Sequence, residues 1–171
     1  ARKGFDRWLE AARGLQGRFP EAAFVWIGQL STWARSLLDD GAGEGIRLSL
    51  PGHVTDLAAW LAAADLFVLT SRQDPGPTVL VDAAQVGTPF VGYASDLGLL
   101  GVADVAGTFV PDDDVDALVD AAARTLAEET AARRTSRAQI VEESQSFPRH
   151  VDDLLSLVGV DVSSPGDPHD G

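Results

Sequence analysis

The 171-residue chain carries 13 basic and 26 acidic side chains, and its net charge of -13 disfavours binding to nucleic acid or to an anionic lipid surface. It has no cysteine, which excludes disulfide bonds, thiolate catalysis and cysteine-ligated metals. With 45% hydrophobic residues the chain can bury a core, but no apolar stretch reaches the roughly 18 residues of a membrane-spanning helix. We expect a cytoplasmic protein without a nucleic-acid partner.

Apolar residues recur alternately at helical spacing and in short continuous runs, which predicts helices that alternate with strands. In chain order the expected elements are a helix (4–18), a strand (22–30), a helix (32–39), a strand (46–53), a helix (56–64), a strand (65–71), a helix (77–86), a strand (89–93), an irregular glycine-rich stretch (95–106), a strand (107–111) and a helix (114–128). The remaining pattern is helical to about residue 158, with an interruption near Pro148.

This alternation predicts βαβ units and a parallel sheet that is covered by helices on both faces. The expected fold is an α/β, Rossmann-like, doubly wound domain over residues 1–158. Residues 159–171 have the composition of a linker, so we expect a disordered tail. In doubly wound folds, ligands bind at the carboxyl ends of the strands, where helix N-termini supply unpaired N–H groups.

A candidate phosphate cradle follows the predicted strand at 65–71. Pro77 suits the first position of a helix, and Gly76 lets a ligand approach the backbone closely. The free N–H groups of Thr78 and Val79, together with the helix dipole, suit a bound phosphate.

Two acids with seven residues between them flank this helix start. Asp82 lies about one turn into the helix, where its carboxylate can accept hydrogen bonds from a diol such as a ribose. Asp74 precedes the helix and faces the loop. The alternative is that Asp74 is a cap or turn residue and that Asp82 is a solvated helix residue.

At these positions the chain resembles family 4 glycosyltransferases. The family signature places two glutamates around the donor-binding turn and helix in the C-terminal domain of a GT-B fold. The matching residues here are Ser71, Asp74, Gly76, Val79, Leu80, Asp82, Ala83, Gly87 and Pro89. The segment RKGFDRWLEAARGL is similar to the family's Lys-Gly helix opening, and the resemblance continues in order over residues 2–128. Both glutamates are aspartates here, so contact with a sugar requires a closer backbone or a bridging water.

The resemblance implies a retaining, hexosyltransferase-like enzyme that transfers a sugar from a nucleotide-diphosphate sugar to an acceptor, without metal or cofactor. Lys3, the only lysine, falls where the family neutralises the donor diphosphate, and Asp74 falls near the transferred sugar. These two residues are the catalytic candidates. Asp82 takes the position of the ribose-binding glutamate, while Gly76, Pro77, Thr78 and Val79 supply the backbone cradle. Gly52, His53 and Val54 would lie by the nucleobase.

The resemblance also implies an N-terminal GT-B domain that carries the acceptor site and is absent from this sequence. We therefore expect the isolated domain to be inactive, and any membrane contact to occur only through the missing domain. The family's first strand, at the centre of the sheet, is absent too. We expect its slot to be closed by rearrangement or filled by another chain, or this sequence to omit an ordered piece, because unpaired strand edges are unfavourable.

Other interpretations remain open. The chain could be a non-catalytic nucleotide-binding or protein-interaction module that kept the fold. A dinucleotide-dependent dehydrogenase is disfavoured, because no Gly-x-Gly-x-x-Gly follows a strand. The Asp-x-Asp within PDDDVDALV is better explained by helix capping than by metal binding. Arg133, Arg134 and Arg137 are interpreted as a solvated face.

Overall fold

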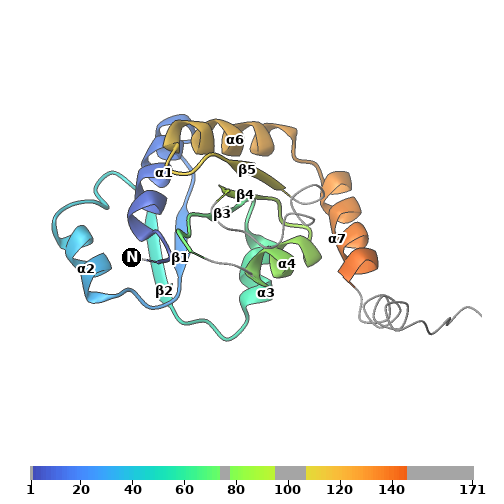
Figure 1. The fold of residues 1–171 in the computed structure, drawn as a ribbon, viewed down its shortest axis with the longest axis horizontal. Helices are drawn as coiled ribbons and strands as arrows, with labels where there is room; N and C mark the ends of the chain where they lie inside the picture. Colours follow the sequence, from blue (N-terminus) through green and yellow to red (C-terminus); the bar gives the residue numbers. More distant parts are fainter. Residues whose placement is uncertain (1, 74–77, 95–106, 146–171) are drawn as a thin grey trace, which may run out of the picture.

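The structure, a computed structural model, describes residues 2–73, 78–94 and 107–145, over which helices alternate with strands (Figure 1). The elements are α1 (Phe5–Arg18), β1 (Phe24–Ile27), α2 (Thr32–Asp39), β2 (Leu48–Gly52), α3 (Leu57–Ala63), β3 (Phe67–Leu69), α4 (Thr78–Gln85), β4 (Phe90–Tyr93), β5 (Gly107–Val110), α6 (Val115–Glu128) and α7 (Ala131–Gln145). Each follows the predicted order, and the α/β class is confirmed.

The strands form two parallel sheets. In the first, β1 pairs with β2, and Phe24 lies opposite Leu48. In the second, β3, β4 and β5 lie side by side, and Phe90 is opposite both Phe67 and Gly107. Within the described ranges no ladder joins β1 to β3, so the strands form two separate sheets. How the slot of the family's first strand is closed or filled stays a prediction.

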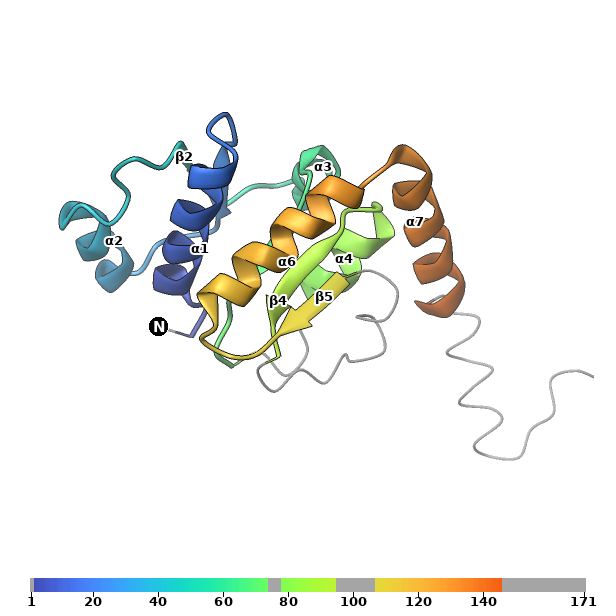
Figure 2. The ribbon, with the colours of Figure 1, turned by 90° about the horizontal axis from the view of Figure 1, so that it is seen from above.

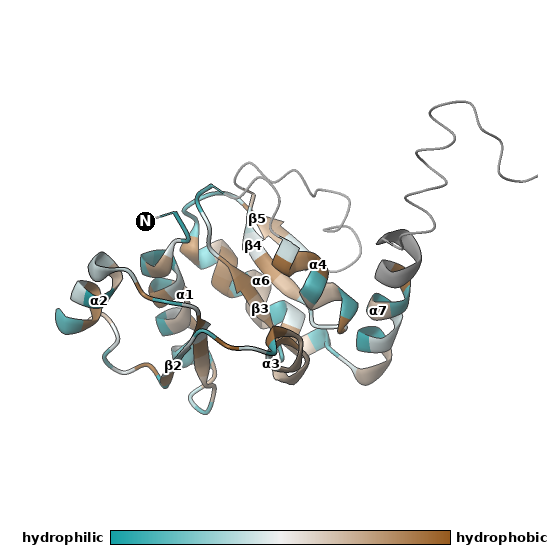
Figure 3. Cartoon of the chain, turned by 90° about the horizontal axis from the view of Figure 1, so that it is seen from below, coloured by the Kyte–Doolittle hydropathy of each residue, from teal (hydrophilic) through white to brown (hydrophobic). Residues whose placement is uncertain are grey.

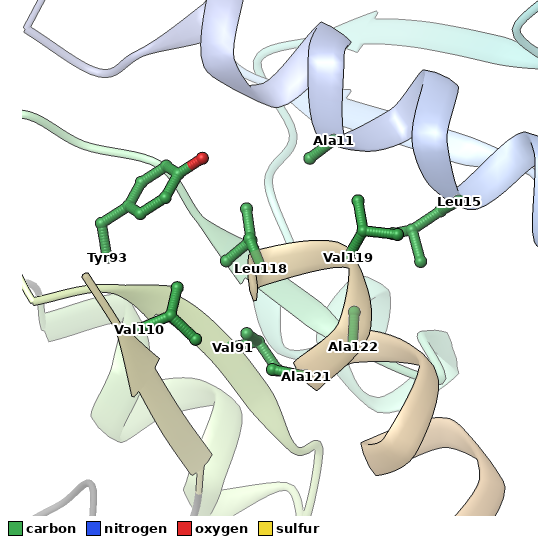
Figure 4. Close-up of a cluster of buried hydrophobic side chains, with 9 residues drawn as sticks. All are labelled: Ala11, Leu15, Val91, Tyr93, Val110, Leu118, Val119, Ala121 and Ala122. Carbon is green, nitrogen blue, oxygen red and sulfur yellow. The ribbon is translucent and has the colours of Figure 1, made fainter. Parts of the chain in front are cut away.

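Helices cover both faces of the three-stranded sheet, because side chains alternate along β4. Val91 and Tyr93 point toward α6, whose Leu118 is fully buried against them (Figure 4). Phe90 points to the opposite face and packs against Leu80 of α4. Figure 2 shows α1 lying alongside α6, and the two helices share this core. Figure 3 shows hydrophobic residues along the strands of this sheet.

The two-stranded sheet is covered differently. Phe24 and Trp26 point toward α1, where the Trp26 ring lies 4.9 Å from Phe5 and 5.5 Å from Trp8 between centroids. Val25 alternates to the opposite face and is 37% exposed. The continuous apolar run at 22–30 predicts a strand that is buried on both faces. That prediction is wrong, because the pleat turns Val25 away from the α1 and α2 layer.

The arginines of α7 are not all solvated, which corrects a second expectation. Arg134 donates to the carbonyl oxygens of Ala62 and Ala64 at 3.1 and 3.0 Å, and so satisfies orphan carbonyls at the end of α3. Arg137 pairs with Glu129, and these two side chains are only 11% and 13% exposed. The pattern of charges resembled a solvated face because the partners of both arginines lie on other elements.

A search of the helices in the described ranges for a membrane-spanning segment found none with the required length and hydropathy.

Candidate functional site

The residues before α1 lie against the carboxyl end of β3. The carbonyl of Arg2 accepts a hydrogen bond from the Arg72 backbone N–H at 2.9 Å. The Thr70 hydroxyl lies 3.0 Å from the carbonyl oxygen of Gly4 and 3.4 Å from that of Lys3. Three consecutive carbonyls are therefore held by two residues at the end of one strand, and Lys3 is the middle residue of the three.

Gly4 allows this close approach. Its φ of 67° lies in the left-handed region, and a Cβ at this position would lie 1.9 Å from the Thr70 carbonyl oxygen. Any larger residue would push the segment away from β3. The Lys-Gly pair seen in the sequence thus has a structural basis, because the glycine permits the contact that places the lysine.

An ion pair reinforces the same contact. Arg72 donates to both carboxylate oxygens of Asp6, with Nη1 to Oδ1 at 2.8 Å and Nη2 to Oδ2 at 2.6 Å. The hydrogen bond from Arg72 lowers the pKa of Asp6 to about 2, and the same interaction raises the pKa of Arg72. Asp6 is therefore ionised and neutralised at physiological pH.

A second contact joins the first turn of α1 to the ends of β4 and β5. The side chain of Arg7 is 8% exposed, pairs with Asp113, and lies over the Tyr93 ring with 5.1 Å from Cζ to the centroid. Burial raises the pKa of Tyr93 to about 12. Within the described part of the chain, Nε and Nη1 of Arg7 and the Tyr93 hydroxyl are buried without a hydrogen-bond partner.

The predicted cradle is described in part. Asp74, Gly76 and Pro77 lie outside the described residues. Thr78 is the first residue of α4 and is exposed, Val79 is half-buried, and Asp82 lies one turn on with a half-buried side chain. The carbonyl of Lys3 adjoins Thr70, and α4 starts six residues after Arg72 along the chain.

The predicted nucleobase residues lie at the carboxyl end of the other sheet. Gly52 is the last residue of β2, has a φ of 76°, and accepts a hydrogen bond from the Gly28 N–H at 2.7 Å. His53 is exposed and Val54 is half-buried. Three residues beyond His53, the side chain of Asp56 caps α3 by accepting from the Ala59 N–H. The two groups of candidates therefore lie at matching edges of two separate sheets.

The Asp-x-Asp segment has the structural role that its pattern indicated. Asp114 caps α6, since its carboxylate accepts a hydrogen bond from the Ala117 N–H at 2.9 Å. Asp113 adopts a φ of 59° and pairs with Arg7. The capping interpretation is confirmed. Over the described ranges, no group of three or more histidines, aspartates or glutamates is arranged to hold a metal ion.

Sequence reasoning missed four residues of this region: Asp6, Arg7, Arg72 and Tyr93. Asp6 and Arg72 are far apart along the chain, so spacing could not pair them. The only signal for this ion pair was that a charged residue lies close to each motif: Asp6 lies two residues after the Lys-Gly pair, and Arg72 follows Ser71. Arg7 adjoins the apolar stripe of α1, which was a weak indication of a buried arginine.

Comparison with known sequences places residues 1–128 in the family described as glycosyl transferases group 1. The Vi polysaccharide biosynthesis protein VipC/TviE of Salmonella typhi is 30% identical over 164 residues, which cover 92% of this chain and 27% of that protein. The chain therefore spans about a quarter of the length of this relative.

Solved structures share the fold at lower identity. A mutant of TarM of S. aureus, solved in a complex that includes UDP, has a TM-score of 0.75 at 16% identity, covering 92% of this chain and 33% of that one. HepE of Anabaena in complex with UDP has a TM-score of 0.72 at 19% identity, covering 91% and 46%. WaaG, a glycosyltransferase of lipopolysaccharide biosynthesis, has a TM-score of 0.66 at 21% identity, covering 91% and 44%. The predicted Rossmann-like half of a GT-B fold is confirmed.

Proposed function

Because this chain belongs to the glycosyl transferases of group 1, we propose that it holds the nucleotide-sugar site of a retaining, hexosyltransferase-like enzyme. The observation that carries the proposal is the attachment of the Lys3 segment to the end of β3. It supports a site at the carboxyl edge of a parallel sheet, where this class of fold binds ligands. We also propose that the enzyme works in the cytoplasm, as its sequence led us to expect.

In this proposal the enzyme stabilises the diphosphate leaving group. A lysine amine is a compact charge that pairs well with phosphate, and Lys3 supplies it. The N–H groups of Thr78 and Val79 add the partial positive charge of the α4 N-terminus. These groups compensate the charge that develops as the bond to the sugar breaks, so no metal is needed.

The remaining candidates would orient the donor. Asp74 would lie near the transferred sugar and Asp82 would accept hydrogen bonds from the ribose. Gly52, His53 and Val54 would contact the nucleobase, because Gly52 ends β2 at the equivalent edge of the neighbouring sheet and the other two residues follow it. We further propose that the acceptor binds in an N-terminal domain outside this chain, so that the chain alone binds donor weakly and forms no product.

Titration calorimetry of the full-length protein with UDP, GDP and ADP tests the donor site. UDP is the first nucleotide to try, since TarM and HepE were solved with it bound. Lys3→Ala should weaken binding by roughly 10- to 100-fold, the usual loss for one charge-assisted hydrogen bond. Asp82→Ala should weaken binding of the same nucleotide. Arg124→Ala is the matched control, because Arg124 is exposed on α6, and it should bind like the wild type.

Two outcomes contradict the proposal. If no nucleoside diphosphate binds, the alternative of a non-catalytic module that kept the fold is favoured. If one of them binds Lys3→Ala and Asp82→Ala as tightly as it binds the wild type, the site lies elsewhere.

The retaining outcome is tested separately by NMR of the product, because retention requires the anomeric configuration of the donor to persist in the product.

A further inference from the structure

The ion pair between Asp6 and Arg72 has no role in the function proposed above, although it adjoins the segment that carries Lys3. We propose that Arg72 is a positioning residue for Lys3: through its backbone N–H and its ion pair with Asp6 it holds residues 2–4 against the end of β3, where the lysine amine meets the donor diphosphate. This inference rests on the proposed donor site and names a residue that determines its geometry.

The backbone contacts bracket Lys3 on both sides. On one side Arg72 donates its N–H to the Arg2 carbonyl at 2.9 Å, and on the other Thr70 donates its hydroxyl to the Gly4 carbonyl at 3.0 Å. An exposed lysine side chain has many rotamers, but its Cα has little freedom when both neighbours are held. The contact therefore lowers the cost of ordering the lysine around a phosphate.

The side chain of Arg72 acts through position, because both of its terminal nitrogens are held by Asp6. Nη1 and Nη2 both bind the Asp6 carboxylate, in the bidentate geometry that only arginine can make. The pair also neutralises Asp6, which would otherwise repel a diphosphate close to Lys3. Arg72 thus contributes to the site without contacting the ligand.

Arg7, the residue after Asp6, prevents α1 from rotating about the ion pair between Asp6 and Arg72. Asp6 and Arg7 are consecutive and engage different elements, the first at the end of β3 and the second at Tyr93 and the turn before α6. Consecutive residues are about 100° apart around a helix, so these two anchors restrain both the position and the rotation of the first turn. Small displacements at Arg72 are therefore passed to Lys3 rather than absorbed by the helix.

A double-mutant cycle on the full-length protein separates positioning from general structural damage. UDP affinity is measured for Arg72→Met, Lys3→Ala and the double variant. Arg72→Met should weaken UDP about tenfold when Lys3 is present and less than about twofold when it is absent, because coupled residues are strongly non-additive. Arg72→Lys should recover only part of the loss. Arg18→Met, which breaks the ion pair with Asp120 at the other end of α1, is the control and should leave affinity unchanged.

An equal loss in both Lys3 backgrounds would overturn the inference, and so would wild-type affinity in Arg72→Met. If the wild type binds no nucleotide, the proposed function fails, and amide hydrogen exchange then decides the positioning role by itself. Asp6→Ala should raise the exchange rate of the Arg72 amide about tenfold or more, because its acceptor on Arg2 is released. Unchanged protection of that amide in Asp6→Ala would refute the anchor directly.

Discussion

Replacing Gly4 by alanine tests the contact on which the candidate site depends. Gly4 has a φ of 67°, which costs alanine about 1–2 kcal/mol. The new Cβ would lie 1.9 Å from the Thr70 carbonyl oxygen, so the segment must move by about 1 Å to reach the shortest contact that real Cβ atoms make. That movement breaks the hydrogen bonds to Arg2 and Gly4, worth about 1 kcal/mol each. We expect a total loss of about 3–4 kcal/mol in the free energy of unfolding.

Gly17 provides a matched control in the same helix. Among the described residues, a Cβ built on Gly17 meets no heavy atom within 4 Å apart from its chain neighbours and the backbone of its own helix, and its φ is not positive. Gly17→Ala should therefore stabilise the helix by up to about 1 kcal/mol. Gly14→Ala should cost about 1–3 kcal/mol, because its Cβ would lie 2.8 Å from a methyl of Val119, a buried and β-branched side chain.

Urea unfolding followed by tryptophan fluorescence measures all three variants. Trp8 and Trp26 are suitable probes, because their rings are 5.5 Å apart between centroids in the cluster behind the Lys3 segment. The reasoning would be refuted if Gly4→Ala unfolded at the same urea concentration as the wild type. It would also be refuted if Gly17→Ala lost as much stability as Gly4→Ala, since the effect would then reflect loss of glycine and not the contact with Thr70.

Three further predictions concern ion pairs and the core. Asp6 has a pKa lowered to about 2, so its pair with Arg72 stabilises the fold above the unfolded pKa of about 4 and loses this effect as pH falls toward 2. Asp6→Asn should cost about 1 kcal/mol at pH 7, given partial exposure, and clearly less at pH 2, where the carboxyl group is partly protonated in the fold, as urea titrations at both pH values can measure. Arg137→Met should lower the free energy of unfolding by about 3 kcal/mol, because it leaves the mostly buried Glu129 carboxylate unpaired. The double variant with Glu129→Gln should regain part of that stability, and thermal unfolding measures both variants. Leu118→Ala should cost about 3 kcal/mol in the same assay, because Leu118 is fully buried, and a loss below 1 kcal/mol would contradict the packing described.

Much of the fold was predictable because local signals were strong. The helix expected at 4–18 is Phe5–Arg18, and the helix expected at 32–39 has those bounds, with the Ser31 hydroxyl capping the Ala34 N–H at 3.2 Å. Apolar periodicity and capping residues act within one turn, so the sequence carries them directly.

Strand ends were predicted less well, because a partner decides them. The strand expected at 65–71 is only Phe67–Leu69, the stretch that pairs with Phe90, Val91 and Gly92. Beyond Leu69 the chain turns its hydrogen-bonding groups to residues 2–4. No local pattern could show that Thr70 and Arg72 would bind a segment 66 or more residues earlier in the chain.

The candidate site divides in the same way. The amino-acid order alone determined the class of fold and predicted a helix start close to Thr78 and a single lysine beside Gly4, because each depends on neighbours along the chain. Tertiary structure alone decided where that lysine lies, since this requires the left-handed Gly4 to meet Thr70 and the charge of Asp6 to meet Arg72. Such pairs form only when the sheet brings distant segments together, and their energy depends on burial and geometry that no single stretch of sequence contains.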